Sequence, residues 1–182
     1  MATRKDKALR VPPQTLETEK ALLGALMIRP EGMIESSDVL SPDAFYAEKH
    51  RIIYRAMLNL YSKNEPVDIE SVRAKLSDEN QLDAVGGIAY LAELAADVPA
   101  ASNARHYAGQ VQKKYMLRSL IDAGEHVAEL GYDEASEIDE TLDKAEKRIY
   151  EVTSSPTLSK FTSLGESLKG AWERRAHLHE HK

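Results

Sequence analysis

The stretch from Asn103 to Gly131 constrains the fold most, because it contains no proline and only Gly109 and Gly124 interrupt it. A single long helix is therefore predicted over 103–131. Two neighbouring apolar stripes run along it with spacings of four, three, four and three residues, the repeat of a coiled-coil seam. The first stripe contains Leu117, Ile121, Gly124, Ala128 and Gly131, and the second stripe contains Met116, Leu120, Ala123, Val127 and Leu130.

A second arm follows the short polar turn YDEAS and repeats the same spacing in Ile138, Leu142, Ala145, Ile149 and Val152. Two arms of matching period joined by a short turn predict an antiparallel helical hairpin over 102–153. One partner arm covers only one stripe of the long helix. We therefore expect the second stripe to contact another copy of the hairpin, with docking on the chain's own globular part as the alternative.

The region 14–101 shows the apolar spacing of short amphipathic helices separated by short connections. Pro30 and Pro99 end two of them, and Thr15, Ser41 and Asp68 stand at positions suited to helix caps. Runs of β-branched residues are nearly absent, which disfavours a large sheet. The predicted fold is all-α: a compact multi-helix globular domain, a long antiparallel helical hairpin, then a linker and a short amphipathic helix.

The ends of the chain differ in character from this centre. Residues 1–13 form a basic tail that we expect to be disordered. The Ser/Thr-rich segment 154–162 is typical of a linker, and 163–182 resumes helical spacing with Leu164, Leu168 and Trp172 on one face. Because the short helix is tethered past a linker, we expect this face to dock on another subunit or domain.

Charge and composition limit the classes of function. The net charge of −6 argues against a chain built mainly to hold nucleic-acid phosphates. No cysteine is present, no apolar run is long enough to span a bilayer, and no signal peptide is recognisable, so we expect a cytoplasmic protein.

The motifs that could carry chemistry are weak. Gly86–Gly87 lacks the preceding strand and following Lys of a phosphate loop, so positive φ angles at a helix start explain it better. His177 and His181 have metal-chelating spacing but no third ligand nearby. We therefore expect no catalytic residue, no cofactor and no metal here, and a binding or assembly module rather than an enzyme.

Five segments in this order and spacing resemble the N-terminal domain of bacterial replicative DNA helicases, the DnaB family. They are VPPQTLETEKALLGALM, FYAEKHRIIYRAMLNLY, EPVDIESVRAKL, the run from LDAVGGIAYLAELAADVPAASNARHYAG to KKYMLRSLI, and EIDETLDKAEKRIYEV. The resemblance covers about 11–153, and FTSLGESLKGAWERR resembles that family's linker helix. The ATPase motor of the family, which binds ATP and Mg²⁺ and grips single-stranded DNA, has no counterpart here, so the chain looks like a fragment cut before the motor.

The resemblance implies a non-catalytic collar domain. In the family, N-terminal domains pair through their hairpins, three pairs form a collar on a hexameric ring, and the collar binds primase and in some cases a helicase loader. We expect the primase contact at exposed groups near the hairpin, namely Glu17, Tyr90, Ile121 and Val127, although Ile121 and Val127 are equally explained as seam residues. The alternatives are a helical module that binds nucleic acid through the basic tail and Arg174–Arg175, or a metal through the terminal histidines.

Overall fold

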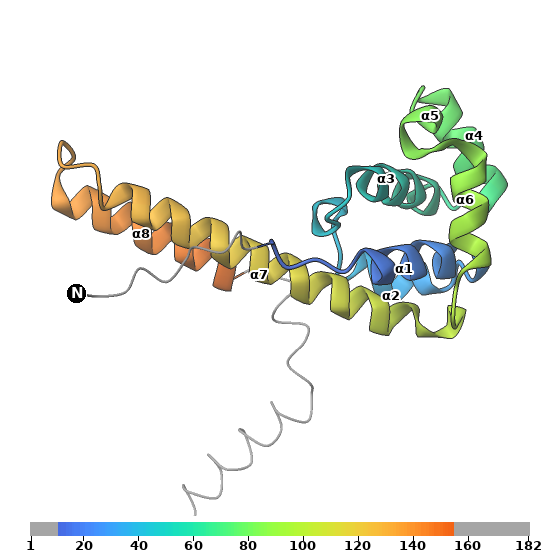
Figure 1. Cartoon of the computed structure of the whole chain (residues 1–182), viewed down its shortest axis with the longest axis horizontal. Coiled ribbons are helices and arrows are strands. Elements are labelled where there is room, and N and C mark those ends of the chain that lie inside the picture. Colours follow the sequence, from blue (N-terminus) through green and yellow to red (C-terminus); the bar gives the residue numbers. More distant parts are fainter. Residues whose placement is uncertain (1–10, 155–182) are drawn as a thin grey trace, which may run out of the picture. The chain divides into compact units, whose positions relative to one another are not determined.

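The computed structural model describes residues 11–154, and all regular secondary structure within that range is helical (Figure 1). The elements, in chain order, are α1 (Leu16–Ile28), α2 (Gly32–Ser37), the 3-10 turn η1 (Pro42–Ala44), α3 (Glu48–Ser62), α4 (Ile69–Asp78), α5 (Leu82–Val85), α6 (Gly87–Ala96), the 3-10 turn η2 (Ala101–Asn103), α7 (Ala104–Leu130) and α8 (Ile138–Thr153). The all-α prediction is confirmed. Two compact units are present, 11–122 and 123–154 within the described range, and each is described by itself.

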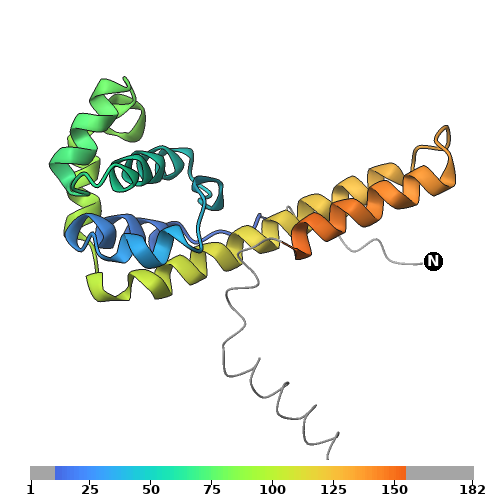
Figure 2. The same cartoon turned by 180° about the vertical axis from the view of Figure 1, so that it is seen from behind.

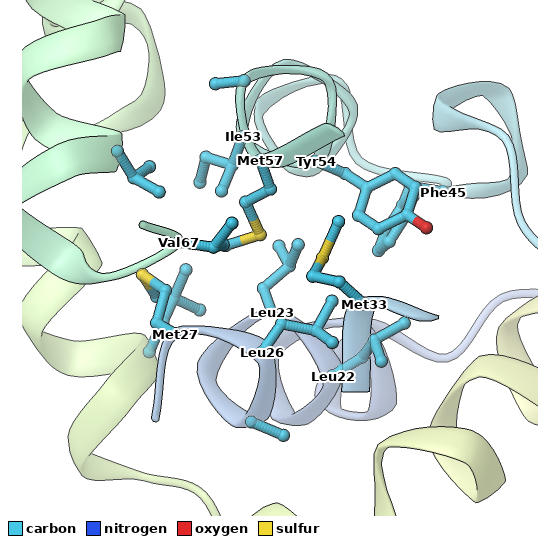
Figure 3. Packing of buried hydrophobic residues seen from close by; sticks show 14 of the residues in the cluster. Leu22, Leu23, Leu26, Met27, Met33, Phe45, Ile53, Tyr54, Met57 and Val67 are labelled. Carbon is cyan, nitrogen blue, oxygen red and sulfur yellow. The ribbon is translucent and has the colours of Figure 1, made fainter. Parts of the chain in front are cut away.

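The core of the globular unit is built around α1. Leu22, Leu23 and Leu26 are fully buried, because α1 is surrounded by α2, α3, α6 and the start of α7. Figure 3 shows Ile53, Tyr54 and Met57 of α3 facing α1 across the core. Ile53 and Met57 are fully buried, whereas Ile88 of α6 is 51% exposed.

Helices α1 and α6 cross at a glycine. A Cβ atom added to Gly24 would lie 1.9 Å from the carbonyl oxygen of Leu94 and 2.5 Å from Cγ2 of Val98. Only a residue without a side chain allows this approach, because the nearest neighbour is backbone that cannot rotate away. The small residue in LLGAL therefore fixes how closely α6 packs on the central helix.

The start of α3 differs from the sequence prediction. Ser41 and Pro42 begin only the short turn η1, and Phe45 then takes an extended conformation, so α3 begins at Glu48. No side chain caps α3; the carboxylate of Glu19 on α1 instead accepts the N–H groups of the two residues that precede the helix, Tyr46 at 2.6 Å and Ala47 at 3.3 Å. Thr15 is also no side-chain cap for α1, whereas Asp68 caps α4 as predicted, accepting from Ser71 N–H at 2.8 Å.

The predicted boundary between the globular domain and the hairpin, between residues 101 and 102, is corrected by the packing of α7. Ala104, Ala108 and Val111 belong to the core of the globular unit, and the boundary between the compact units lies after Asp122. The long helix itself is confirmed over Ala104–Leu130, but its first half packs in the globular core and is not part of the hairpin. Pro13, assigned by composition to the tail, accepts a hydrogen bond from Arg118 of α7 at 2.8 Å.

The second compact unit is the hairpin formed by the end of α7 and by α8, which run side by side in Figures 1 and 2. Ala123 and Val152 are its buried apolar residues, at 0% and 9% exposure. Ile138 and Leu142 are 66% and 59% exposed, although the four-three spacing assigns them to the seam. A hairpin of two helices has too little interior to cover every apolar side chain that it carries.

Gly86 and Gly87 separate α5 from α6. Their φ angles are +104° and +71°, as predicted from the paired glycines, and Gly86 is both the end of α5 and the cap of α6. The sharp reversal lets the fully buried Leu91 of α6 face the core. The pair therefore has a structural role at the junction of α5 and α6.

Several sequence predictions concern residues outside 11–154. The disordered tail over 1–10, the linker continuing to 162, the helix over 163–182 with Leu164, Leu168 and Trp172, and the histidines His177 and His181 all lie outside the described residues. Among the helices that are described, none combines the length and the apolar character needed to cross a membrane.

Candidate functional site

A chain of buried polar groups joins α1, α3 and α6. The carboxylate of Glu19 lies 2.6 Å from Nδ1 of His50, and Nε2 of His50 lies 2.7 Å from the hydroxyl of Tyr90. Glu19 and His50 are each 1% exposed and Tyr90 is 8% exposed. Both ring nitrogens of His50 are therefore within hydrogen-bond distance of a partner, and the tautomer with the proton on Nδ1 would donate to the Glu19 carboxylate and accept from the Tyr90 hydroxyl.

Glu19, His50 and Tyr90 are connected in the order of a carboxylate–imidazole–hydroxyl triad. Their chemistry nevertheless differs from that of an activated nucleophile. Burial, followed by the charges of Glu93, Glu17 and Glu19, raises the pKa of Tyr90 to about 12. A nucleophile needs the opposite shift, toward the ionised form. These hydrogen bonds therefore pair buried polar groups and connect three helices. Leaving any of the three side chains unpaired in the interior would lower the stability of the fold.

The sequence contains a signal for the two members that pattern analysis missed. Glu19 stands between Leu16 and Leu22 on a helix that is apolar nearly all round, and His50 precedes Ile53 and Met57 by helical spacing on the apolar face of α3. A charged residue and an imidazole on buried faces require partners. Their pairing across 31 positions of the chain follows only from the packing.

A charged surface lies next to Tyr90. The ammonium of Lys49 is 3.5 Å from the centroid of the Tyr90 ring, a cation–π contact. On the facing surfaces of α1 and α6, Lys20 bridges Glu17 at 3.5 Å and Glu93 at 3.8 Å. We name Lys49, Lys20, Glu17 and Glu93 the charged quartet.

The four residues expected to contact primase are not equivalent. The side chain of Glu17 is 87% exposed, and Ile121 is 48% exposed, so both are accessible. Val127 is half-buried within the hairpin. The expectation that Tyr90 is an exposed contact is wrong, because its hydroxyl points to buried His50 and its ring lies beneath Lys49.

The two stripes of α7 also differ in accessibility. In the second stripe, expected to form the oligomer interface, Ala123 is fully buried, Met116, Val127 and Leu130 are half-buried, and Leu120 is 51% exposed. Ala123 is therefore already covered inside one chain and cannot contact a second copy in this conformation. In the first stripe Leu117 and Ile121 are 39% and 48% exposed, and Gly124 and Ala128 are exposed.

Arg118 joins α7 to the segment that precedes α1. Its guanidinium donates to the carbonyl oxygens of Pro13 at 2.8 Å and Ala44 at 2.6 Å, and it lies 5.5 Å from the ring centroid of Tyr46. Burial, the largest influence, lowers the pKa of Arg118 from its usual value. These contacts fix the N-terminal segment and η1 on α7, a structural role that needs the planar, multi-donor guanidinium.

Other kinds of site find no support in the described part of the chain. Within 11–154, no group of three or more His, Asp or Glu side chains is arranged to hold a metal ion. The hairpin, 123–154, carries ten acidic and three basic residues, which disfavours it as a surface for nucleic-acid phosphates. The accessible features with the chemistry of recognition are the charged quartet and the exposed apolar residues of the two helical arms.

Comparison with known proteins shows which family this helical arrangement resembles. Residues 11–113 match the family described as DnaB-like helicase N terminal domain. The chain is 39% identical over 173 residues to the replicative DNA helicase DnaC of Bacillus subtilis and 38% identical over 170 residues to the replicative DNA helicase DnaB of Geobacillus stearothermophilus. These alignments cover 95% and 93% of this chain but only 38% and 37% of the relatives.

Solved structures agree with the sequence relatives. The N-terminal domain of DnaB helicase from Mycobacterium tuberculosis superposes with a TM-score of 0.74 at 36% identity, covering 78% of this chain and 99% of that one. A DnaB-like replicative helicase, solved in a study of its interactions with primase, superposes with a TM-score of 0.66 at 24% identity over 89% of this chain and 35% of its own, and supports the fold alone. The helical core, the hairpin and the family match over 11–113 together show that this chain belongs to the DnaB-like helicase N-terminal domain family.

Proposed function

We propose that this chain is the non-catalytic N-terminal region of a replicative DNA helicase, which assembles with copies of itself through the hairpin and recruits primase to the replication fork. The observation that carries assembly is the exposure of large apolar side chains on the two arms, including Ile121, Leu142 and Ile138. Apolar residues recurring at coiled-coil spacing and left uncovered in one chain favour contact with another helix. Six copies arranged as three pairs would form a collar.

The proposed interface differs from the one predicted from sequence alone. Because Ala123 is covered by its own chain, we assign the contact between copies to the exposed first stripe of α7 and to the exposed residues of α8. We propose that ATP-driven unwinding, with its nucleotide and Mg²⁺, belongs to the part of a longer protein that these residues do not cover. Primase is the proposed partner of the assembled collar, and membership of the helicase N-terminal domain family supports this proposal. A helicase loader is a further proposed partner.

Assembly is tested by sedimentation of the full 182-residue chain over a range of concentrations. The wild-type chain is expected to form dimers or larger species, and Ile121→Asp or Leu142→Asp is expected to shift it toward monomer, because a charge would be buried in an apolar contact. Ile34→Asp is the matched control, since Ile34 is 59% exposed on α2 of the globular unit. A wild-type chain that stays monomeric at every concentration would contradict pairing through this hairpin.

Primase recruitment is tested by titrating the full chain with the C-terminal domain of the primase from the same organism, using calorimetry to obtain affinity and stoichiometry together. Saturable binding is the expected result. Absence of any binding by a folded, assembled chain would contradict the primase part of the proposal and leave the assembly part standing.

A further inference from the structure

Residues 11–14, which we name the strap, lie on the globular unit without entering its core. The core cluster of the described residues contains no member of the strap, and Val11 is 70% exposed. Two of the four strap residues are prolines, which have no N–H group to donate. Thr15, the next residue, is already tied to α1, because its carbonyl oxygen accepts from the N–H of Glu19 at 3.0 Å. The strap therefore depends on side chains of other elements for its position.

The guanidinium of Arg118, which we name the latch, makes the one hydrogen bond between the strap and the rest of 11–154. One of its Nη atoms donates to the carbonyl oxygen of Pro13 at 2.8 Å, and the other donates to that of Ala44 at 2.6 Å. The ring centroids of Tyr46 and Tyr115 lie 5.5 and 5.9 Å from its central carbon. Three of these four contacts do not involve the strap, so the latch keeps its position when the strap leaves it.

A second feature opposes the closed position of the strap. The side-chain oxygen Oε1 of Gln14 is buried and has no hydrogen-bond partner among the described residues. A buried acceptor without a donor costs free energy of the same order as a hydrogen bond from a charged donor contributes. Moving the strap outward would expose this oxygen to water while breaking the bond from Arg118. The closed strap is thus held by a near balance between two opposing effects.

We propose that the strap is a moving part that opens and closes on the folded globular unit, with Arg118 as its latch. In the closed form Pro13 accepts from Arg118 and Gln14 is buried, and in the open form water replaces both contacts. Opening needs no unfolding of the core, because the strap contributes no side chain to the core. This device sets whether residues 11–14 lie against α7, and it depends neither on the proposed assembly nor on primase.

The experiment uses electron paramagnetic resonance with one spin label on the strap. The full 182-residue chain contains no cysteine, so a nitroxide attached to Val11→Cys is its only label, and the exposure of Val11 leaves room for it. The labelled parent should show a restricted component from the closed strap and a mobile component from the open strap. Arg118→Met should raise the ratio of mobile to restricted label by about tenfold or more, because one charge-assisted hydrogen bond is lost.

Two further variants test the two opposing effects. Arg105→Met is the matched control, because Arg105 is an exposed arginine of the same helix outside the latch, and its spectrum should equal that of the parent. Gln14→Met removes the unpaired oxygen at similar side-chain length, so the restricted component should grow. Equal spectra for Arg118→Met and the parent would overturn the latch. A Gln14→Met spectrum without that gain would overturn the opposing effect.

Heating the labelled parent separates local opening from unfolding of the whole unit. The label should become mobile at temperatures where the circular dichroism signal of the helices is still complete. A label that becomes mobile only together with the loss of helix would show that the strap opens by global unfolding, which contradicts the proposal. A label that is fully mobile at low temperature would contradict the closed form. Both outcomes are measured on the parent, so they hold even if Arg118→Met fails to fold.

Discussion

The two compact units differ in how far they bury their large apolar side chains. In the globular unit the large side chains of α1 and α3, such as Leu23 and Met57, are fully buried by other helices of the same chain. In the hairpin, Ile138 and Leu142 have the spacing of a seam and remain more than half exposed. The globular unit therefore has a fully buried core of its own, although Ile34 and Ile88 on its surface are 59% and 51% exposed, whereas the two helices of the hairpin leave residues with seam spacing uncovered. The contrast supports folding around the core of the globular unit and agrees with the proposal that copies associate through the hairpin.

The largest expected effect tests this contrast with the same truncation in each unit. Leu23→Ala should lower the free energy of unfolding by about 2–5 kcal/mol, because it removes fully buried contacts and leaves a cavity. Leu142→Ala, at a residue that is 59% exposed, should cost far less in the single chain. Urea unfolding measures both. A loss for Leu142→Ala that grows with protein concentration would place Leu142 in a contact between copies.

Glycine-to-alanine substitution gives the next comparison. Gly24→Ala should destabilise the globular unit by about 3 kcal/mol, since its Cβ would overlap the backbone oxygen of Leu94. Gly124→Ala in the hairpin meets no atom within 4 Å, so a gain of up to about 1 kcal/mol from helix propensity is expected. Thermal unfolding of the two variants measures the difference. A destabilising Gly124→Ala would instead show that this face of α7 is packed against a second copy.

Alkaline pH should lower the stability of the globular unit through Tyr54 in its core. Burial raises the pKa of Tyr54 from 10.0 to about 12, with a smaller opposing effect from the Ser36 hydroxyl. The unfolded chain loses the Tyr54 hydroxyl proton near pH 10, while the folded chain keeps it. The stability that Tyr54 contributes is therefore fully present below pH 10 and is lost as pH rises through 12. The loss from this residue amounts to about 2–3 kcal/mol.

Substitution identifies the residue responsible. Unfolding followed between neutral pH and pH 12 should show a shallower decline for Tyr54→Phe than for wild type. Tyr132→Phe, at an 87% exposed residue of the hairpin turn, should leave the decline unchanged. Equal pH profiles for wild type and Tyr54→Phe would show that another group governs alkaline unfolding.

The smallest expected effect concerns backbone conformation. Gly86→Ala should cost about 1–2 kcal/mol, because φ at this position is +104° and an added Cβ would lie 3.1 Å from Cβ of Tyr90. Gly131→Ala, after the end of α7, should be nearly neutral, since its closest neighbour would be 3.4 Å away, an ordinary contact. Thermal melting of the two variants compares them, and equal losses would mean that backbone strain at Gly86 is not the cause.

The sequence by itself determined the helical class, the long α7 and its pairing arm, because repeating apolar spacing and the absence of proline act locally along the chain. The positive φ angles at Gly86–Gly87 and the Asp68 cap were likewise predictable, since each depends on one or a few adjacent residues. The family resemblance followed from five such local segments in order.

Only the tertiary structure decided which apolar stripe of α7 is covered, where the globular unit ends, and which side chain binds the backbone just before α3. Ala123 and Gly124 are neighbours in two stripes of the same spacing, yet Ala123 is fully buried and Gly124 is exposed. Glu19, His50 and Tyr90 belong to three different helices, so their hydrogen bonds depend on how those helices cross. Periodicity predicts which residues share a face of a helix, but the element that faces them is chosen by packing across the whole domain.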